Sequence, residues 1–230
     1  MTDDDAPSVT GPPPGVRTTR RRGRTSAAKT AVLDQLGPAW TLPAAGPWDA
    51  AALDAGFGQG GPLRVDIGVG SGEATRAWAV EAPEARVLAI ELHRPGLAKL
   101  LGALEADGPA NVRVVEADAL GVLEQLDPGS VAALRLLFPD PWPKRRHVER
   151  RMVDRAFVGL AARVLEPGGQ LHLATDWADY AEHMRTMVAT EPRLARVLDA
   201  GRPARPVTTY ERRGLELGRT ITDLVYRLDA

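Results

Sequence analysis

The sequence contains no cysteine, which excludes disulfides and thiolate metal ligands. Its four histidines show no spacing typical of a metal site, so we expect no bound metal. No apolar run is long enough to cross a bilayer, and we expect no membrane partner. These absences favour a cytoplasmic protein. Nothing in the chain indicates a protein partner, and a monomer and a homodimer both remain open.

The sequence also lacks an excess of positive charge. The formal net charge is −1, which is unusual for a nucleic-acid-binding protein, so any affinity for phosphate must come from local patches. One patch is residues 17–29, with six basic residues and no acid. Residues 1–30 cannot build a core, and we predict a disordered basic N-terminal arm before a single domain over residues 31–230. The arm is either a solubilising tail or a segment that lies along RNA phosphates.

Short apolar runs alternate with stretches of helical spacing from residue 63 onward. The predicted strands are Leu63–Ile67, Arg86–Ile90, Val112–Val115, Val131–Phe138, Gln170–Ala174 and, closing the sheet edge, Ile221–Arg227. The predicted helices are 73–81, 95–106, 119–126, 148–165 and 177–188. This alternation predicts an α/β fold with a Rossmann-like, doubly wound, mostly parallel sheet. Residues 31–62, rich in proline and glycine, are interpreted as an irregular lead-in on the surface.

A glycine-rich loop follows the first predicted strand, with Gly68, Gly70 and Gly72 after Asp66. Glycines at a strand-to-helix turn let the backbone approach a ligand closely. The dinucleotide fingerprint requires its third glycine at position 73, where this chain has Glu73. A pyrophosphate is repelled by nearby carboxylates, whereas the sulfonium and ammonium groups of S-adenosylmethionine are attracted by them. The loop therefore favours S-adenosylmethionine over NAD.

Two further acids follow the next two predicted strands. Glu91 lies where a ribose diol is bound in such folds, and Asp118 lies where an adenine amino group can donate to it. Either acid is also interpretable as a helix N-cap. Together with Asp66 they form three acids at the carboxyl ends of consecutive strands, which predicts one cofactor site.

The fourth predicted strand ends in Phe138-Pro139-Asp140-Pro141-Trp142-Pro143, followed by basic residues from Lys144. Its three prolines predict a rigid turn at the edge of the sheet where ligands bind. Asp140 and Trp142 would then lie beside the methyl donor. The alternative is a structural turn with an incidental acid and a buried tryptophan.

These motifs resemble the bacterial tRNA (guanine-N7)-methyltransferases over most of the chain. The resemblance rests on Arg21–Pro38, Asp66–Gly72, Ala89–His93, Pro139–Trp142, Lys144–Arg151, Ala174–Ala181 and Pro206–Gly218. It implies a class I methyltransferase fold, S-adenosylmethionine as cofactor, tRNA as partner, and methylation of N7 of the variable-loop guanine at tRNA position 46.

The resemblance also implies residue roles. The residues implied to bind the cofactor are Asp66, Glu91, Asp118 and Asp140, beside the loop glycines Gly68 and Gly70, and Asp140 is implied to be the catalytic residue. The residues implied to bind the substrate are Lys144, Asp176, Thr208, Thr209, Tyr210 and Glu211. Each substrate assignment has a structural alternative: an N-cap for Asp176, a solvated charge run for Lys144 and a loop tip for 208–211.

Two residues depart from the family pattern. Thr209 stands where lysine is frequent, and Glu149 stands where a basic residue is common. Both lower the positive charge offered to RNA. Two other functions remain open: a methyltransferase for another RNA or a small molecule, and a non-catalytic cofactor-binding RNA chaperone.

Overall fold

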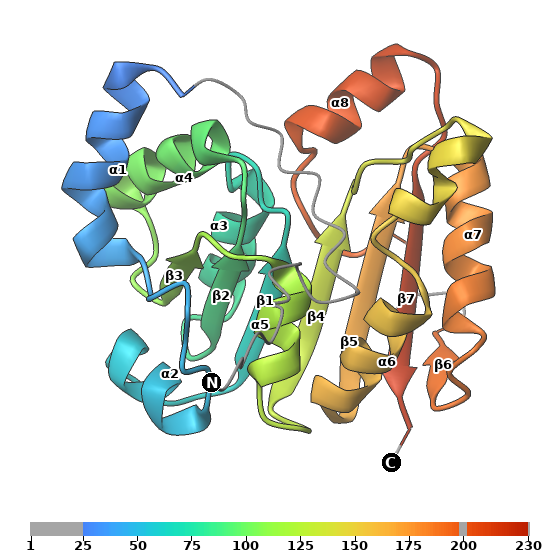
Figure 1. Ribbon diagram of the computed structural model, residues 1–230, viewed down its shortest axis with the longest axis horizontal. Coiled ribbons are helices and arrows are strands. Elements are labelled where there is room, and N and C mark those ends of the chain that lie inside the picture. Colours follow the sequence, from blue (N-terminus) through green and yellow to red (C-terminus); the bar gives the residue numbers. More distant parts are fainter. Residues whose placement is uncertain (1–24, 198–201, 230) are drawn as a thin grey trace, which may run out of the picture.

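A seven-stranded sheet forms the centre of the computed structural model, which describes residues 25–197 and 202–229 (Figure 1). The strand order is β3-β2-β1-β4-β5-β7-β6. The strands are β1 (Leu63–Ile67), β2 (Arg86–Ile90), β3 (Val112–Val115), β4 (Val131–Leu137), β5 (Leu165–Thr175), β6 (Leu194–Arg196) and β7 (Thr222–Leu228). Strands β1 to β5 pair in parallel, and β7 is antiparallel to both its neighbours. The predicted mostly parallel sheet is confirmed.

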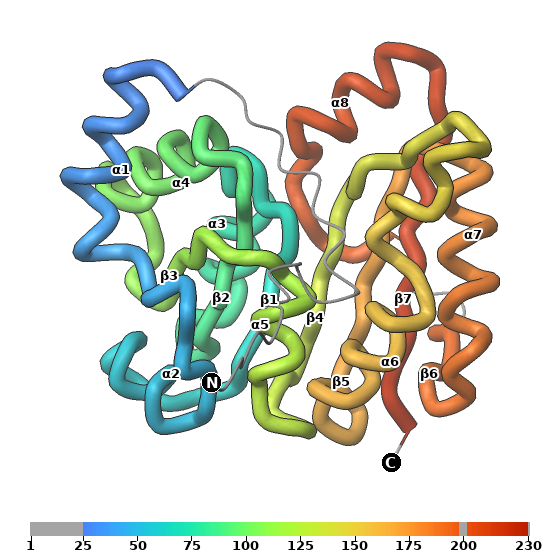
Figure 2. The backbone as a smooth tube through the Cα atoms, viewed as in Figure 1, coloured from blue at the N-terminus to red at the C-terminus, as the bar shows by residue number. Residues whose placement is uncertain are grey.

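Helices cover the sheet in two groups. They are α1 (Ala27–Trp40), α2 (Ala50–Phe57), α3 (Glu73–Glu81), α4 (Arg94–Asp107), α5 (Ala119–Gln125), α6 (Arg155–Val164), α7 (Ala178–Val188), α8 (Thr209–Glu216) and the 3-10 helix η1 (Arg145–Arg150). One apolar cluster joins the sheet to α2, α5, α6 and α7, and a second joins it to α1, α3 and α4. Figure 2 traces the crossovers that carry the chain between strands.

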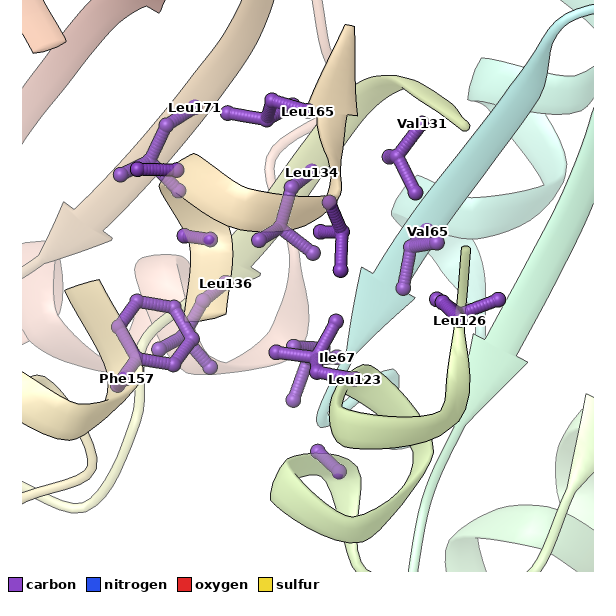
Figure 3. Close-up of a cluster of buried hydrophobic side chains, with 14 of the residues drawn as sticks. Val65, Ile67, Leu123, Leu126, Val131, Leu134, Leu136, Phe157, Leu165 and Leu171 are labelled. Carbon is purple, nitrogen blue, oxygen red and sulfur yellow. The ribbon is translucent and has the colours of Figure 1, made fainter. Parts of the chain in front are cut away.

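The side-chain alternation of β2 shows why both faces are covered. Leu88 and Ile90 belong to the first cluster, whereas Val87 and Ala89 belong to the second. A strand that is apolar on both faces must lie inside a sheet with helices on each side. Figure 3 shows the first cluster, where Val65 and Leu134 of neighbouring strands meet the helical side chains below them.

The stretch interpreted as an irregular lead-in is instead largely helical. Ser26 caps α1 by accepting a hydrogen bond from the N–H of Lys29, and Asp49 caps α2 by accepting one from Ala52. The prolines and glycines interrupt the helical spacing of this stretch, and Pro38 lies in the last turn of α1. Of the arm predicted over residues 1–30, residues 1–24 lie outside the described residues. Its last four residues belong to α1.

Two further expectations differ from the structure. The predicted helix over 148–165 is divided, because Asp154 caps a new helix by accepting a hydrogen bond from the N–H of Phe157. The predicted edge strand β7 lies one place inside the edge, which is formed by β6. Within the described residues, no helix is both long and apolar enough to cross a membrane.

Candidate active site

A cavity of about 190 Å³ opens at the carboxyl ends of the central strands. It lies where β1 has β2 on one side and β4 on the other, which is the point where the chain reverses its direction of travel across the sheet. The lining residues are Ile67, Gly68, Ile90, Glu91, Leu92, Ala117, Ala119, Leu136, Pro139, Asp140, Trp142, Arg150 and Met152. Ligands of open α/β sheets bind at this position.

The glycine loop forms one wall of the cavity and is held by Glu91. Gly68 and Gly70 have φ values of 71° and 57°, a conformation that favours glycine. The Glu91 carboxylate accepts the Gly70 N–H at 2.8 Å, and its other oxygen accepts the N–H groups of Leu92 and His93 at 2.7 and 2.8 Å. Glu91 does not cap α4, whose N-cap is His93 without a side-chain bond. It therefore fixes the loop while lining the cavity.

Asp66 lies beneath the same loop and is only 2% exposed. Its carboxylate accepts hydrogen bonds from Thr75 at 2.7 Å and from the Arg135 guanidinium at 2.6 and 3.1 Å. Arg135 in turn stacks over Trp78, 4.2 Å from the ring centroid. Because a buried charge needs partners, this ion pair holds the end of β1 against β4. Asp66 supports the loop from below, and it borders a smaller cavity beside the larger one.

Asp118 uses only one of its two carboxylate oxygens to cap a helix. Oδ1 accepts the Leu120 N–H at 2.8 Å and so caps α5. Oδ2 is buried and has no hydrogen-bond partner among the described residues. The flanking residues Ala117 and Ala119 line the cavity. A buried carboxylate oxygen without a donor is costly, and the amino group of a bound adenine is a donor of the required kind.

The turn after β4 is strained on both sides of Asp140. Phe138 and Trp142 have φ values of 53° and 42°, although neither is glycine and each precedes a proline. Such conformations cost on the order of 1–3 kcal/mol each and concentrate at functional sites. Asp140 is exposed at the rim of the cavity, and Trp142 lines the cavity. The turn therefore brings a carboxylate and an aromatic ring to the same cavity.

A strongly basic segment follows this turn. The Arg150 guanidinium lies 5.1 Å from the centroid of Trp142, and the His147 ring meets the edge of that indole at 5.7 Å. Partial desolvation, followed by the positive charges of Arg150, Arg146 and Lys144, lowers the pKa of His147. The neighbouring basic side chains create a local positive potential, which attracts phosphate despite the net charge of −1. Lys144 is exposed at the start of η1.

Asp176 lies at the end of β5, next to the strand that carries Asp140. The interpretation of Asp176 as a helix cap is wrong, because α7 has Trp177 as its N-cap and no side-chain cap bond. Its Oδ2 instead accepts a hydrogen bond from Arg219 at 2.7 Å, and this arginine lies 4.9 Å from the Trp177 ring centroid. A Cβ added to Gly214 would lie 2.9 Å from that oxygen, so α8 packs closely on Asp176.

The segment interpreted as a possible loop tip is the first turn of α8. Thr208 caps the helix by accepting the Glu211 N–H at 3.2 Å. Thr209 contacts Glu73 through both its hydroxyl and its backbone N–H. Tyr210 is 56% exposed and lies over Gly70.

Glu211 points away from this surface into a buried ionic network. Its carboxylate accepts hydrogen bonds from Arg202 at 3.1 Å and from Arg205. Arg205 continues the network to Asp223 at 3.1 Å, and His172 lies 2.7 Å from the same acid. Burial alone would raise the pKa of Asp223, but His172 and Arg205 hold it below its ordinary value. With two arginine partners, Glu211 holds α8 to β7, and its predicted substrate contact stays a prediction.

Several residues of this site were missed by sequence reasoning. Arg135 and Arg219 hold the acids Asp66 and Asp176, but their partners are far away in the sequence. Helix α8 had a local signal, because Thr208 and Glu211 have the spacing of a capping box. For Glu73, the local sequence indicates only that the third glycine of the dinucleotide fingerprint is absent.

Comparison with known proteins agrees with this geometry. Residues 60–224 match a family model described as a putative methyltransferase. The 16S rRNA methyltransferase KamB has a TM-score of 0.55 at 19% identity, covering 80% of this chain and 95% of its own. The aminoglycoside resistance methyltransferase NpmB1 has a TM-score of 0.53 at 17% identity, covering 79% and 94%. These two structures show the fold alone. Fold, site and family together define an S-adenosylmethionine-dependent methyltransferase.

Sequence relatives define the family more narrowly. A tRNA (guanine-N(7)-)-methyltransferase of Alkalilimnicola ehrlichii is 45% identical over 96% of this chain and 96% of its own length. Relatives with the same name from Ralstonia nicotianae and Streptomyces coelicolor are 42% and 41% identical, covering 97% and 90% of this chain and 91% and 78% of their own length. This chain belongs to the tRNA (guanine-N(7)-)-methyltransferase family.

Proposed function

We propose that this chain transfers a methyl group from S-adenosylmethionine to N7 of a guanine in tRNA, at position 46 of the variable loop. The observation that carries the proposal is the 190 Å³ cavity, where the glycine loop, Glu91 and Asp140 meet in a chain 45% identical to an enzyme of that name. Because its interior is mostly apolar with a few convergent polar groups, the cavity suits a small-molecule cofactor.

The residues around the cavity fit the parts of this cofactor. Gly68 keeps the backbone open on one wall, and Glu91, which holds Gly70, offers its remaining carboxylate lone pairs to the ribose hydroxyls. Asp118 offers its unpartnered Oδ2 to the adenine amino group. S-adenosylmethionine supplies the electrophilic methyl group when bound. Asp66 acts indirectly, by holding the glycine loop through its ion pair with Arg135.

The acceptor needs positioning more than proton transfer. Guanine N7 carries a lone pair and no proton at neutral pH, so no general base is required. The residues must hold N7 in line with the methyl group and exclude water. Asp140 either stabilises the positive charge that develops on the purine or accepts the N1–H and amino protons of guanine. Trp142 also lines the cavity, and its ring is the aromatic group there that would stack on the base.

The RNA backbone requires positive charge close to this site. Lys144, Arg145 and Arg146 are exposed immediately after the turn, and Arg212 and Arg213 are exposed on α8. Figure 1 shows α8 beyond the carboxyl ends of β4 and β5, on the same side of the sheet as the turn. Phosphate contacts of this kind fix the register of the RNA without reading bases. Specificity then comes from tRNA shape and one exposed base.

The experiment is methyl transfer from isotopically labelled cofactor to one unmodified tRNA transcript, with mapping of the modified nucleotide. Label at N7 of the variable-loop guanine is expected, and a transcript with adenine at that position should remain unlabelled. Label elsewhere in the tRNA would support methyl transfer to tRNA but reject the proposed position in the variable loop. Cofactor binding without any transfer to RNA would favour a small-molecule methyltransferase or a non-catalytic RNA chaperone.

A further inference from the structure

One side chain joins the glycine loop to α8. Glu73 is the first residue of α3, directly after the loop, and its carboxylate accepts two hydrogen bonds from Thr209. The backbone N–H of Thr209 donates at 3.0 Å, and its hydroxyl donates at 2.9 Å. The two residues are 136 positions apart in the sequence. The contact is also favourable because a carboxylate lies at the positive end of the α8 dipole.

The residue next to this contact lies on the loop. A ring carbon of Tyr210 would be 3.3 Å from a Cβ added to Gly70, which is a close approach. Thr208 and Tyr210 line a cavity of about 30 Å³, and this small cavity shares Ile67 and Gly68 with the larger one. The first turn of α8 is therefore the outer wall of the space beside the glycine loop.

Ion pairs hold the rest of α8 to the opposite side of the site. Glu211 pairs with Arg202 and Arg205, and the following Arg219 pairs with Asp176. These contacts fix α8 to the part of the sheet formed by β5 and β7. The Glu73 contact ties the helix to α3 by two hydrogen bonds.

We propose that Glu73 is a positioning residue of the cofactor site. By holding Thr209, it keeps Tyr210 against the glycine loop and slows release of the cofactor. The inference rests on the proposed function, because it takes the larger cavity as the cofactor site. It also accounts for the residue at position 73, where a dinucleotide-binding loop would have glycine.

The test measures S-adenosylhomocysteine binding and dissociation in Glu73→Ala, Glu73→Gln and Thr209→Val. Loss of two hydrogen bonds in Glu73→Ala should raise Kd by about 3- to 10-fold, mostly through faster dissociation. Glu73→Gln should have a smaller effect, because its amide oxygen still accepts the Thr209 N–H. Thr209→Val should also have a smaller effect, because it removes only the hydroxyl bond. Hydrogen exchange of the Thr209 amide should be faster in Glu73→Ala.

The matched control is Glu81→Ala, which removes an exposed acid from the other end of the same helix. Unchanged S-adenosylhomocysteine kinetics in Glu73→Ala, with faster exchange of the Thr209 amide, would overturn the inference. Equal effects in Glu73→Ala and Glu81→Ala would also overturn it, since they indicate general destabilisation of α3. Absence of binding to the wild-type protein would instead reject the cavity as the cofactor site.

Discussion

The candidate active site has two sides that are held by different kinds of contact: a proposed cofactor side with the glycine loop, Asp66 and Glu91, and a proposed acceptor side with Asp140, Asp176 and α8. On the cofactor side, Glu91 accepts three backbone N–H groups, and the Asp66–Arg135 pair is buried with both side chains at most 4% exposed. On the acceptor side, the Asp176–Arg219 pair is partly exposed, at 17% and 36%, while the Glu211–Arg205 pair behind α8 is buried. Buried, backbone-linked groups are fixed before a ligand arrives, whereas a partly exposed ion pair contributes less and rearranges more easily.

The comparison separates two tasks. A small cofactor of constant shape is bound best by a preorganised cavity. A large RNA contacts many exposed side chains, and the acceptor side can adjust to it without disturbing the sheet. Substitutions on the cofactor side should therefore affect folding and cofactor affinity together, whereas those on the acceptor side should affect turnover or RNA binding alone.

The largest effect is expected from Arg135→Ala. It leaves Asp66 buried without its ionic partner, so the free energy of unfolding should fall by about 3–5 kcal/mol. Denaturant unfolding measures this loss. Arg64→Ala is the control, because Arg64 stacks on the same Trp78 ring but donates to a carbonyl oxygen, and it should cost much less.

If Arg135→Ala does not fold, the double variant Asp66→Asn/Arg135→Met tests the same point. It removes both charges and should recover much of the lost stability. A single variant as stable as the wild type would show that the cofactor side is not held by this pair.

The next largest effect concerns Asp140, on the acceptor side. Asp140→Ala should lower kcat by about 10²- to 10³-fold, as for loss of one preorganised group, without changing unfolding. Single-turnover methyl transfer at saturating cofactor and tRNA measures it. Asp140→Asn separates the two roles: retained activity indicates orientation of guanine, and loss equal to that of alanine indicates charge.

Glu84→Ala removes an exposed acid just before β2, at the opposite end of the strands, and serves as the control for Asp140. Near-wild-type turnover in Asp140→Ala, with folding intact, would mean that the reaction occurs at another strand end.

A smaller effect is expected from Glu91→Ala. The variant leaves the Gly70 N–H without its acceptor and removes the predicted ribose contact, so cofactor binding should weaken by about 1–3 kcal/mol. Calorimetry with S-adenosylhomocysteine measures this, and affinity for tRNA should stay unchanged. Glu116→Ala is the control, because that acid follows β3 but pairs with Arg94 on the surface at 3.8 Å. Equal losses in both variants would contradict a specific role of Glu91.

The same division describes what the sequence could predict. The cofactor side depends on strands followed at once by glycines or acids, so Gly68, Glu91 and Asp118 could be placed from local spacing. Their partners could not, because the Asp66–Arg135 pair joins residues 69 positions apart. Nothing local to Arg135 distinguishes a buried ion pair from an exposed charge.

The acceptor side was predictable mainly through family resemblance. The resemblance predicts substrate contacts for Asp176 and Glu211, but their observed contacts with Arg219 and Arg205 depend on how α8 packs. That packing requires Gly214, where a Cβ would meet Asp176. Hydrophobic periodicity also failed to predict α1 and α2, because prolines and glycines interrupt the helical spacing in this stretch. Ser26 and Asp49 nevertheless cap the two helices.

The smallest effect is expected from Thr209→Lys, which adds a positive charge at the boundary between the two sides. The backbone N–H of residue 209 still donates to Glu73, so cofactor affinity should change little. The exposed ammonium group should lower the KM for tRNA by about 2- to 5-fold at low salt and make the logarithmic salt dependence of binding steeper by about 1.

Thr209→Gln, which adds length without charge, is the control. Equal salt dependence in the lysine and glutamine variants would show that RNA phosphates do not approach this end of α8. A tRNA affinity that rises only together with cofactor affinity would show instead that α8 acts through the cofactor side.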